Sequence, residues 1–134
     1  MEIGKPSEAE FEQVIQLANS MKLDVTDASR EQFIIVKDSN YVAAFARIFP
    51  KGTLYELATL GVVKTYRGQG LSMLLVEKLR ELYPQLYLVT VIPEYFKKLG
   101  FEVSNEIPKE LESKYNQCEL WHGYGDPVVM KCEA

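Results

Sequence analysis

Six consecutive residues, Arg67-Gly68-Gln69-Gly70-Leu71-Ser72, combine a cation, two glycines and the start of a helical pattern. They stand between an apolar stretch, Leu54 to Val63, and an amphipathic run, Leu71 to Leu82. A strand, a glycine-rich turn and a helix in this order place several unpaired backbone N–H groups at a helix start. Such a cluster binds anions, so the sequence predicts a ligand that carries phosphate.

Two common phosphate-binding motifs do not fit this turn. A P-loop needs Gly-Lys-Ser/Thr at the helix start, and the sequence has none there. A dinucleotide fingerprint needs a third glycine where Met73 stands, and an acidic residue where Leu88 and Val89 stand. A helix start whose glycines serve only tight turning remains the alternative.

A carboxylate lies in the apolar stretch before the turn. In a regular strand, Glu56 shares a face with the aliphatic residues Leu54, Ala58, Leu60 and Val62. Aliphatic surroundings make a carboxylate readier to accept a proton, and a general base must take one from an ammonium acceptor. Glu56 is therefore the candidate general base, with an exposed or ion-paired strand glutamate as the alternative.

The composition limits the classes of function. The 134 residues are 47% hydrophobic and 25% charged, which suits one globular domain over residues 1–134. The 15 basic and 19 acidic residues argue against a nucleic-acid surface. The 2 cysteines and 1 histidine form no zinc-like cluster, so we expect no metal. Without a signal sequence or a membrane-spanning run, we expect a cytoplasmic protein with no membrane partner.

Hydrophobic periodicity predicts an α/β fold, with one mixed, mostly antiparallel sheet of about six or seven strands and helices on both faces. Strands are expected at residues 1–4, 33–36, 41–49, 54–63, 86–91 and 127–132. Helices are expected after the Ser7–Glu10 capping box and at residues 71–82, 93–99 and 108–115. Turns at 38–40 and 50–52 predict a meander, and the helix 71–82 makes strand 86–91 parallel to 54–63.

Two helices have predicted details. The first should bury a face made of Phe11, Val14, Ile15, Ala18 and Met21, and the helix 71–82 a face made of Leu71, Leu74, Leu75, Leu79 and Leu82. Gly100 should end the helix 93–99, with Phe101 packing back on Phe96.

The run from Arg67 to Ser72, preceded by Leu60-Gly61-Val62 and Tyr66, resembles the acyl-CoA pyrophosphate loop of the GNAT acetyltransferases, R/Q-x-x-G-x-G/A. Ser72 departs from the final Gly or Ala. A second stretch, Tyr95 to Phe101, resembles the family's F-Y-x-K-x-G-F before the sixth strand. With the order of elements, the resemblance covers nearly the whole chain and implies an N-acetyltransferase that uses acetyl-CoA.

The resemblance also implies where the coenzyme lies. The diphosphate would sit on backbone N–H groups of Gly68 to Ser72, with Arg67 adding charge. The pantetheine arm would pair with Leu60 and Val62, where the central strand and its parallel neighbour splay apart, and Phe96 would line the thioester channel. The implied coenzyme-binding set is Leu60, Val62, Arg67, Gly68, Gln69, Gly70, Leu71, Ser72 and Phe96.

Several members of the family carry the general base at the position of Glu56, six residues before Val62. Many members have a tyrosine that acts as the general acid four residues before the glycine of K-x-G-F, where this chain has Phe96. The adjacent Tyr95 points about 100° away on a helix. Tyr95 is the candidate general acid, with a hydrophobic or surface role as the alternative. Because a thiolate leaves readily without assistance, catalysis does not depend on a general acid here.

Ile107-Pro108, Tyr115-Asn116 and Val128-Val129-Met130 are similar to the acetyltransferase domain of the N-acetylglutamate synthase type. This resemblance implies an amino-acid acceptor, whose carboxylates Arg30 and Arg47 could bind. His122 is either an acceptor-side contact or an ordinary loop histidine.

The function expected is acetyl transfer from acetyl-CoA to a primary amine of a small molecule, by a monomer or homodimer. A catalytically silent CoA-binding or sensor module and a protein lysine or N-terminal acetyltransferase remain alternatives. Release of thiol from acetyl-CoA would separate the enzyme from the silent module, and an open acidic groove would favour a protein acceptor.

Overall fold

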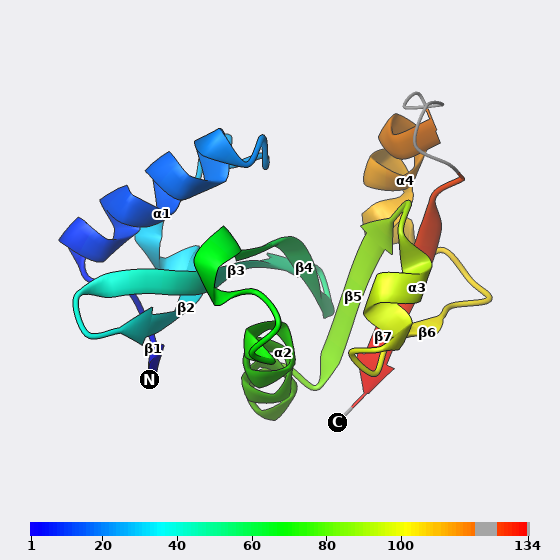
Figure 1. The fold of residues 1–134 in the computed structure, drawn as a ribbon. Helices are drawn as coiled ribbons and strands as arrows, with labels where there is room; N and C mark the ends of the chain where they lie inside the picture. The colour runs from blue at the N-terminus through cyan, green and yellow to red at the C-terminus, as the bar shows by residue number, and fades with distance from the viewer. Residues whose placement is uncertain (120–125, 134) are drawn as a thin grey trace. The chain divides into compact units, whose positions relative to one another are not determined.

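The computed structural model describes residues 1–119 and 126–133 (Figure 1). The strands are β1 Glu2–Gly4, β2 Phe33–Asp38, β3 Tyr41–Lys51, β4 Leu54–Val62, β5 Gln85–Thr90, β6 Glu102–Val103 and β7 Val128–Glu133. The α-helices are α1 Glu8–Ser20, α2 Leu71–Leu82, α3 Pro93–Lys97 and α4 Glu112–Glu119, with short 3-10 helices η1 Arg30–Gln32, η2 Lys64–Tyr66 and η3 Lys109–Leu111. No helix in these ranges has the length and hydrophobicity needed to cross a membrane.

The strands follow the order β1-β2-β3-β4-β5-β7-β6 in a seven-stranded sheet. β4 and β5 are parallel, whereas the pairs β1–β2, β2–β3, β5–β7 and β6–β7 are antiparallel. The predicted fold class, with its one parallel crossover, is therefore confirmed.

Contacts divide the chain into two compact units, each with a core of its own. Unit 1 comprises Met1–Ile48 and Leu57–Lys78, and unit 2 comprises Phe49–Glu56 and Leu79–Ala134. A single domain over residues 1–134 stays a prediction.

In unit 1, α1 lies across the strands β2 and β3 (Figure 1). Two residues of the predicted α1 face, Val14 and Ala18, are fully buried, and Phe11 and Met21 pack against the same cluster. The strands contribute Phe33, Ile35, Val42 and Phe45 to this core. Four of the five residues predicted for the α1 face therefore belong to this core, whereas Ile15 is half-buried and is not among them.

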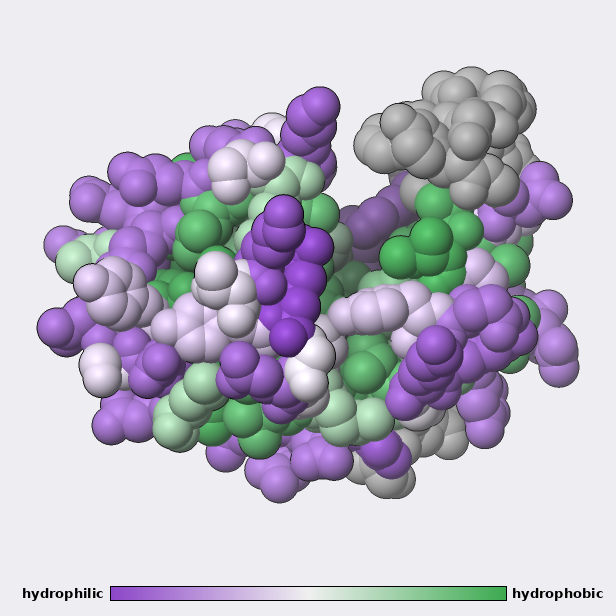
Figure 2. Space-filling view, in the orientation of Figure 1, coloured by the Kyte–Doolittle hydropathy of each residue, from purple (hydrophilic) through white to green (hydrophobic). Residues whose placement is uncertain are grey.

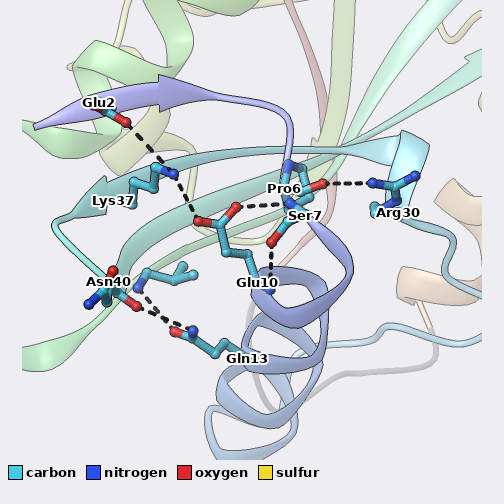
Figure 3. A network of polar contacts seen from close by, with 9 residues as sticks. Glu2, Pro6, Ser7, Glu10, Gln13, Arg30, Lys37 and Asn40 are labelled. Carbon is cyan, nitrogen blue, oxygen red and sulfur yellow. Dashed lines mark hydrogen bonds and ion pairs between the residues drawn. The ribbon is translucent and has the colours of Figure 1, made fainter.

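The predicted capping box starts α1 (Figure 3). The backbone N–H of Glu10 donates to Ser7 Oγ at 3.2 Å, and the backbone N–H of Ser7 donates to Glu10 Oε1 at 2.8 Å. The other oxygen of Glu10 accepts a hydrogen bond from Lys37 Nζ at 3.0 Å, and Lys37 Nζ also lies 3.7 Å from Glu2 Oε2. Glu10 of the capping box therefore connects the start of α1 to Lys37 of β2.

This network predicts how the stability of the protein depends on pH. The hydrogen bond from the Ser7 backbone, followed by that from Lys37, lowers the pKa of Glu10 below its usual 4.5. A lowered folded-state pKa stabilises the protein above pH 4.5, and this contribution is lost as the pH falls through the folded-state pKa. Glu10→Gln should therefore reduce the free energy of unfolding at pH 7, and the difference from wild type should be smaller at about pH 3, below the usual pKa of 4.5.

Urea unfolding at the two pH values measures this difference, and Glu12→Gln on the exposed side of α1 controls for the loss of one charge. The hydrogen bond from Lys37 to Glu10 also raises the pKa of Lys37. The contribution of Lys37 is also stabilising but has the opposite pH dependence, being present at neutral pH and lost as the pH rises above 10.5. A difference between wild type and Glu10→Gln that is the same at pH 3 as at pH 7 would contradict the prediction.

In unit 2, η3 and α4 supply the apolar cover for the beginning of β4 and for β7. Leu54, Leu111 and Val129 form a buried cluster, against which Tyr87, Val89 and Tyr115 pack. The predicted glycine cap of α3 is also confirmed. Gly100 has a φ of +95°, the Phe101 N–H donates to Phe96 O at 3.1 Å, and the rings of Phe96 and Phe101 lie 5.9 Å apart.

Some predicted boundaries and the predicted buried face of α2 need correction. β3 continues to Lys51 where a turn was expected at residues 50–52, since Pro50 near a strand end removes only one N–H donor. Leu74 and Leu82 of α2 are 39% and 48% exposed, because the buried stripe is centred on Leu75 and Leu79. The predicted helix 108–115 begins as η3 and continues as α4 to Glu119, into the stretch expected to be a loop from residue 116.

Candidate functional site

The glycine-rich turn lies in unit 1, between η2 and α2. Gly68 and Gly70 have φ values of +82° and +75°, in the left-handed region that glycine adopts without strain. A Cβ atom at either position would meet no described atom within 4 Å. The two glycines are therefore needed for the backbone conformation, and the space beside them is open. Figure 2 shows hydrophilic residues over this segment.

The start of α2 directs backbone donors out of the same turn. The earliest α2 hydrogen bond runs from Leu74 N to Gly70 O at 3.1 Å, so the N–H groups of residues 71–73 precede the helical ladder. Leu71 is buried and anchors this first turn, and Ser72 is 9% exposed and interacts within the protein. This is the arrangement, a helix N-terminus with its partial positive charge, that binds anions in proteins, and phosphate binding here stays a prediction.

The edge of β4 supplies backbone groups next to this turn. Val63 N donates to Ala43 O of β3 at 2.9 Å. Backbone groups alternate between the two edges of a strand, so those of Leu60 and Val62 point away from β3, on the edge to which Glu56 also belongs. Along that edge, the pairs between β4 and β5 are Tyr55–Leu86 and Glu56–Tyr87. Within the part of the chain that the structure describes, Leu60 and Val62 follow the last such pair.

Arg67 and Val62, which are both predicted coenzyme contacts, are in direct contact. Arg67 Nε donates to Val62 O at 3.2 Å, which places the exposed guanidinium at the end of β4. Packing requires glycine at position 61, between Leu60 and Val62, since a Cβ atom there would lie 2.6 Å from the Phe45 ring. Unit 1 thus brings together Leu60, Val62 and the whole turn from Arg67 to Ser72.

Glu56 lies in unit 2 and is buried, with 2% of its side chain exposed. Its Oε2 accepts a short hydrogen bond from Lys114 Nζ of α4, and its Oε1 lies 3.6 Å from Lys51 Nζ. The aliphatic surroundings expected for this carboxylate therefore include two ammonium groups. Glu56 is an ion-paired strand glutamate, and its role as a base stays a prediction.

Tyr95 and Phe96 both lie on α3 in unit 2. Tyr95 is 42% exposed, and its ring meets that of Phe96 edge-on at 5.1 Å. Phe96 packs on Phe101, as the glycine cap required. Their roles in protonating the thiolate and lining the thioester channel stay predictions.

The two arginines predicted to bind the acceptor are both in unit 1 and differ in exposure. Arg47 is 3% exposed, and its guanidinium donates to Gln32 Oε1 at 2.9 Å and to Thr26 O at 2.8 Å. It therefore anchors the connection between α1 and β2. Arg30 is exposed and donates to Pro6 O at 3.4 Å. Acceptor binding by either stays a prediction, and His122 lies outside the described residues.

Lys114 is the side chain that sequence reasoning missed. A buried carboxylate requires a partner of opposite charge, which is a signal that could have prompted a search for a lysine. The predicted helix 108–115 carries both Lys109 and Lys114, and no local pattern selects between them. The packing of Leu111 and Tyr115 against the Leu54 cluster decides which one reaches Glu56.

Comparisons with known proteins find one matching family model and several similar proteins. A family model described as "Acetyltransferase (GNAT) domain" matches residues 29–103. An uncharacterised N-acetyltransferase of Chlorobaculum tepidum is 24% identical over 125 residues, which are 89% of this chain and 76% of that protein.

Two solved structures are similar in fold. A Mycobacterium tuberculosis protein in complex with CoA and NLQ has a TM-score of 0.75 at 13% identity, over 100% of this chain and 99% of that one. N-acetylglutamate synthase from Neisseria gonorrhoeae, complexed with coenzyme A and N-acetyl-glutamate, has a TM-score of 0.68 at 17% identity. The latter match covers 98% of this chain and 34% of the synthase.

Proposed function

Because the chain belongs to the GNAT family of N-acetyltransferases, which use acetyl-CoA, we propose that its acceptor is a primary amine on a small molecule, with amino acids as the leading class. The observation that carries the coenzyme assignment is the turn in unit 1. Gly68 and Gly70 adopt left-handed conformations beside open space, at the start of a helix whose first N–H groups point outward. The diphosphate of the coenzyme fits these donors.

The proposed chemistry uses the turn and residues of the strand β4 that precedes it in the chain. Arg67 adds positive charge beside the diphosphate, and the Leu60 backbone and the Val62 N–H, which point away from β3, offer hydrogen bonds to the pantetheine arm. An amine attacks a thioester only when neutral, so a base must first remove a proton from the ammonium form. Glu56 is our candidate for that base.

The amino-acid class is supported by the acceptor half of the sequence resemblance and by the acetylated amino acid in the gonococcal synthase structure. An α-amino acid brings a carboxylate that needs a cation. The exposed Arg30 is the better placed of the two predicted arginines, since the Arg47 guanidinium is almost wholly enclosed.

A thiol-detection assay tests this function. Purified protein is mixed with acetyl-CoA and a panel of amino acids, other small amines and peptides, and release of free CoA thiol is followed. We expect amine-dependent release, greatest with an amino acid. Release with peptides alone would instead support a protein acetyltransferase.

A parallel thermal-shift measurement separates the silent coenzyme-binding module from the enzyme. Both should be stabilised by CoA, by about 2.7 kcal/mol at one hundred times Kd. Stabilisation by CoA, with no release of thiol from acetyl-CoA in the presence of any amine, would support the silent module. Absence of both would refute the coenzyme site.

Tyr95→Phe is expected to keep turnover within about threefold of wild type, whereas loss of a true general acid costs about 10²- to 10⁴-fold. The reason is that a CoA thiolate leaves without assistance and Tyr95 is 42% exposed. Steady-state turnover with the best acceptor measures the effect. A loss of about 10²-fold or more, with CoA affinity unchanged, would assign the acid to Tyr95.

A further inference from the structure

The Glu56 carboxylate is held unequally by its two lysine partners. Lys114 Nζ makes a direct hydrogen bond to Oε2, whereas Lys51 Nζ lies 3.6 Å from Oε1, beyond the usual range for an N–H···O hydrogen bond. One oxygen is thereby fixed by a charged donor, and the other has only the longer ion pair among the contacts of the described residues. This asymmetry favours Oε1 as the oxygen that takes the incoming proton, because no donor lies within hydrogen-bond distance of it among the contacts of the described residues.

The side chains of Lys114 and Lys51 are similarly exposed, at 31% and 38%, but the backbone that carries Lys114 is held by buried neighbours. Leu111 is fully buried three residues before Lys114, and Tyr115 beside it packs on the cluster around Leu54. Leu54 is two residues before Glu56 on β4, so one apolar cluster anchors the backbone on both sides of the ion pair. Lys51 comes from the end of β3, and its side chain is 38% exposed.

We propose that Lys114 is a positioning residue for Glu56, holding Oε2 so that Oε1 faces the proton of the acceptor ammonium. This inference rests on the proposed function, since it needs Glu56 to act as the base. Lys114 touches neither acceptor nor coenzyme in this role. It acts by fixing the direction of a carboxylate that would otherwise rotate between several orientations.

A double-mutant cycle in the full chain tests the inference. Lys114→Met should lower turnover about tenfold while the KM for acetyl-CoA stays within about twofold, because misplacing a catalytic group weakens the chemical step rather than binding. Lys114→Arg keeps the charged donor and should retain turnover within about threefold. In a Glu56→Gln background, Lys114→Met should have no further effect on turnover.

Lys109→Met is the matched control, because Lys109 is an exposed lysine on η3 five residues from Lys114. If Lys114→Met fails to fold, Lys114→Gln, which keeps an uncharged N–H donor, replaces it in the cycle and should lower turnover in the wild-type background but not in the Glu56→Gln background. The double variant leaves no buried carboxylate without its partner.

Full turnover in Lys114→Met would overturn the proposal. So would a Lys114→Met change that lowers turnover equally in the wild-type and the Glu56→Gln backgrounds. A Lys114→Arg protein with turnover as low as that of Lys114→Met would also overturn it. Unchanged turnover in Glu56→Gln would refute the base, and this inference with it. A failed proposed function gives a different result, in which wild-type protein itself releases no thiol.

Discussion

Glu56→Gln is expected to lower turnover by about 10²- to 10⁴-fold at neutral pH and to leave CoA affinity unchanged. Glutamine has nearly the same shape as glutamate but cannot take a proton from the acceptor ammonium. The coenzyme contacts that we propose at the turn lie in unit 1, while Glu56 belongs to unit 2. Turnover with the best acceptor and CoA affinity from calorimetry are the two measurements.

Glu110→Gln is the matched control for this change. Glu110 is an exposed carboxylate of η3 in the same unit. Its Oε2 accepts a hydrogen bond from Thr53 Oγ1 at 3.4 Å. Urea unfolding of both variants shows whether loss of the Lys114 ion pair has weakened the fold. Wild-type turnover in Glu56→Gln would remove this residue from the mechanism.

Replacing both Gly68 and Gly70 with alanine is expected to weaken CoA binding by roughly one hundredfold. An L-residue pays about 1–2 kcal/mol at each left-handed position, and about 1.4 kcal/mol corresponds to a tenfold change in affinity. The alanine turn would populate other conformations, so the binding-competent fraction would fall. Calorimetric titration with CoA measures the effect, and each single variant should lose about tenfold.

Gly100→Ala is the control for backbone strain. Gly100 also has a positive φ, +95°, but it caps α3 in unit 2. A Cβ atom there would lie 3.5 Å from the Arg80 guanidinium, an ordinary contact distance. This variant should lose stability while keeping wild-type CoA affinity. An unaltered Kd in the Gly68/Gly70 double variant would mean that the diphosphate binds elsewhere.

Several features of the fold were predictable because they depend on neighbours in the sequence. The Ser7–Glu10 capping box, the Gly100 cap with Phe101, and the helix Leu71–Leu82 were each expected from a few adjacent residues. Caps and helical periods arise from hydrogen bonds and side-chain spacing within about one turn of the chain. The same holds for the glycine-rich turn, whose positive φ values need glycine wherever the turn is placed.

Features that depend on distant partners were not predictable in this way. The exposure of Leu74 and Leu82 reflects how α2 is rotated against its neighbours, which a spacing pattern defines only approximately. Arg47 was expected at an acceptor site, and the structure encloses it against Gln32 and Thr26, 15 and 21 residues away in the chain.

The amino-acid sequence alone therefore determined the glycine-rich turn, the order of strands and helices, and a carboxylate in the middle of an apolar strand. Tertiary structure alone decided what surrounds that carboxylate, because Lys114 is 58 residues away and reaches Glu56 only after α4 has packed on the cluster of Leu54, Leu111 and Val129. Local backbone preferences act between neighbouring residues, whereas the partner of a buried charge is selected by the folded core.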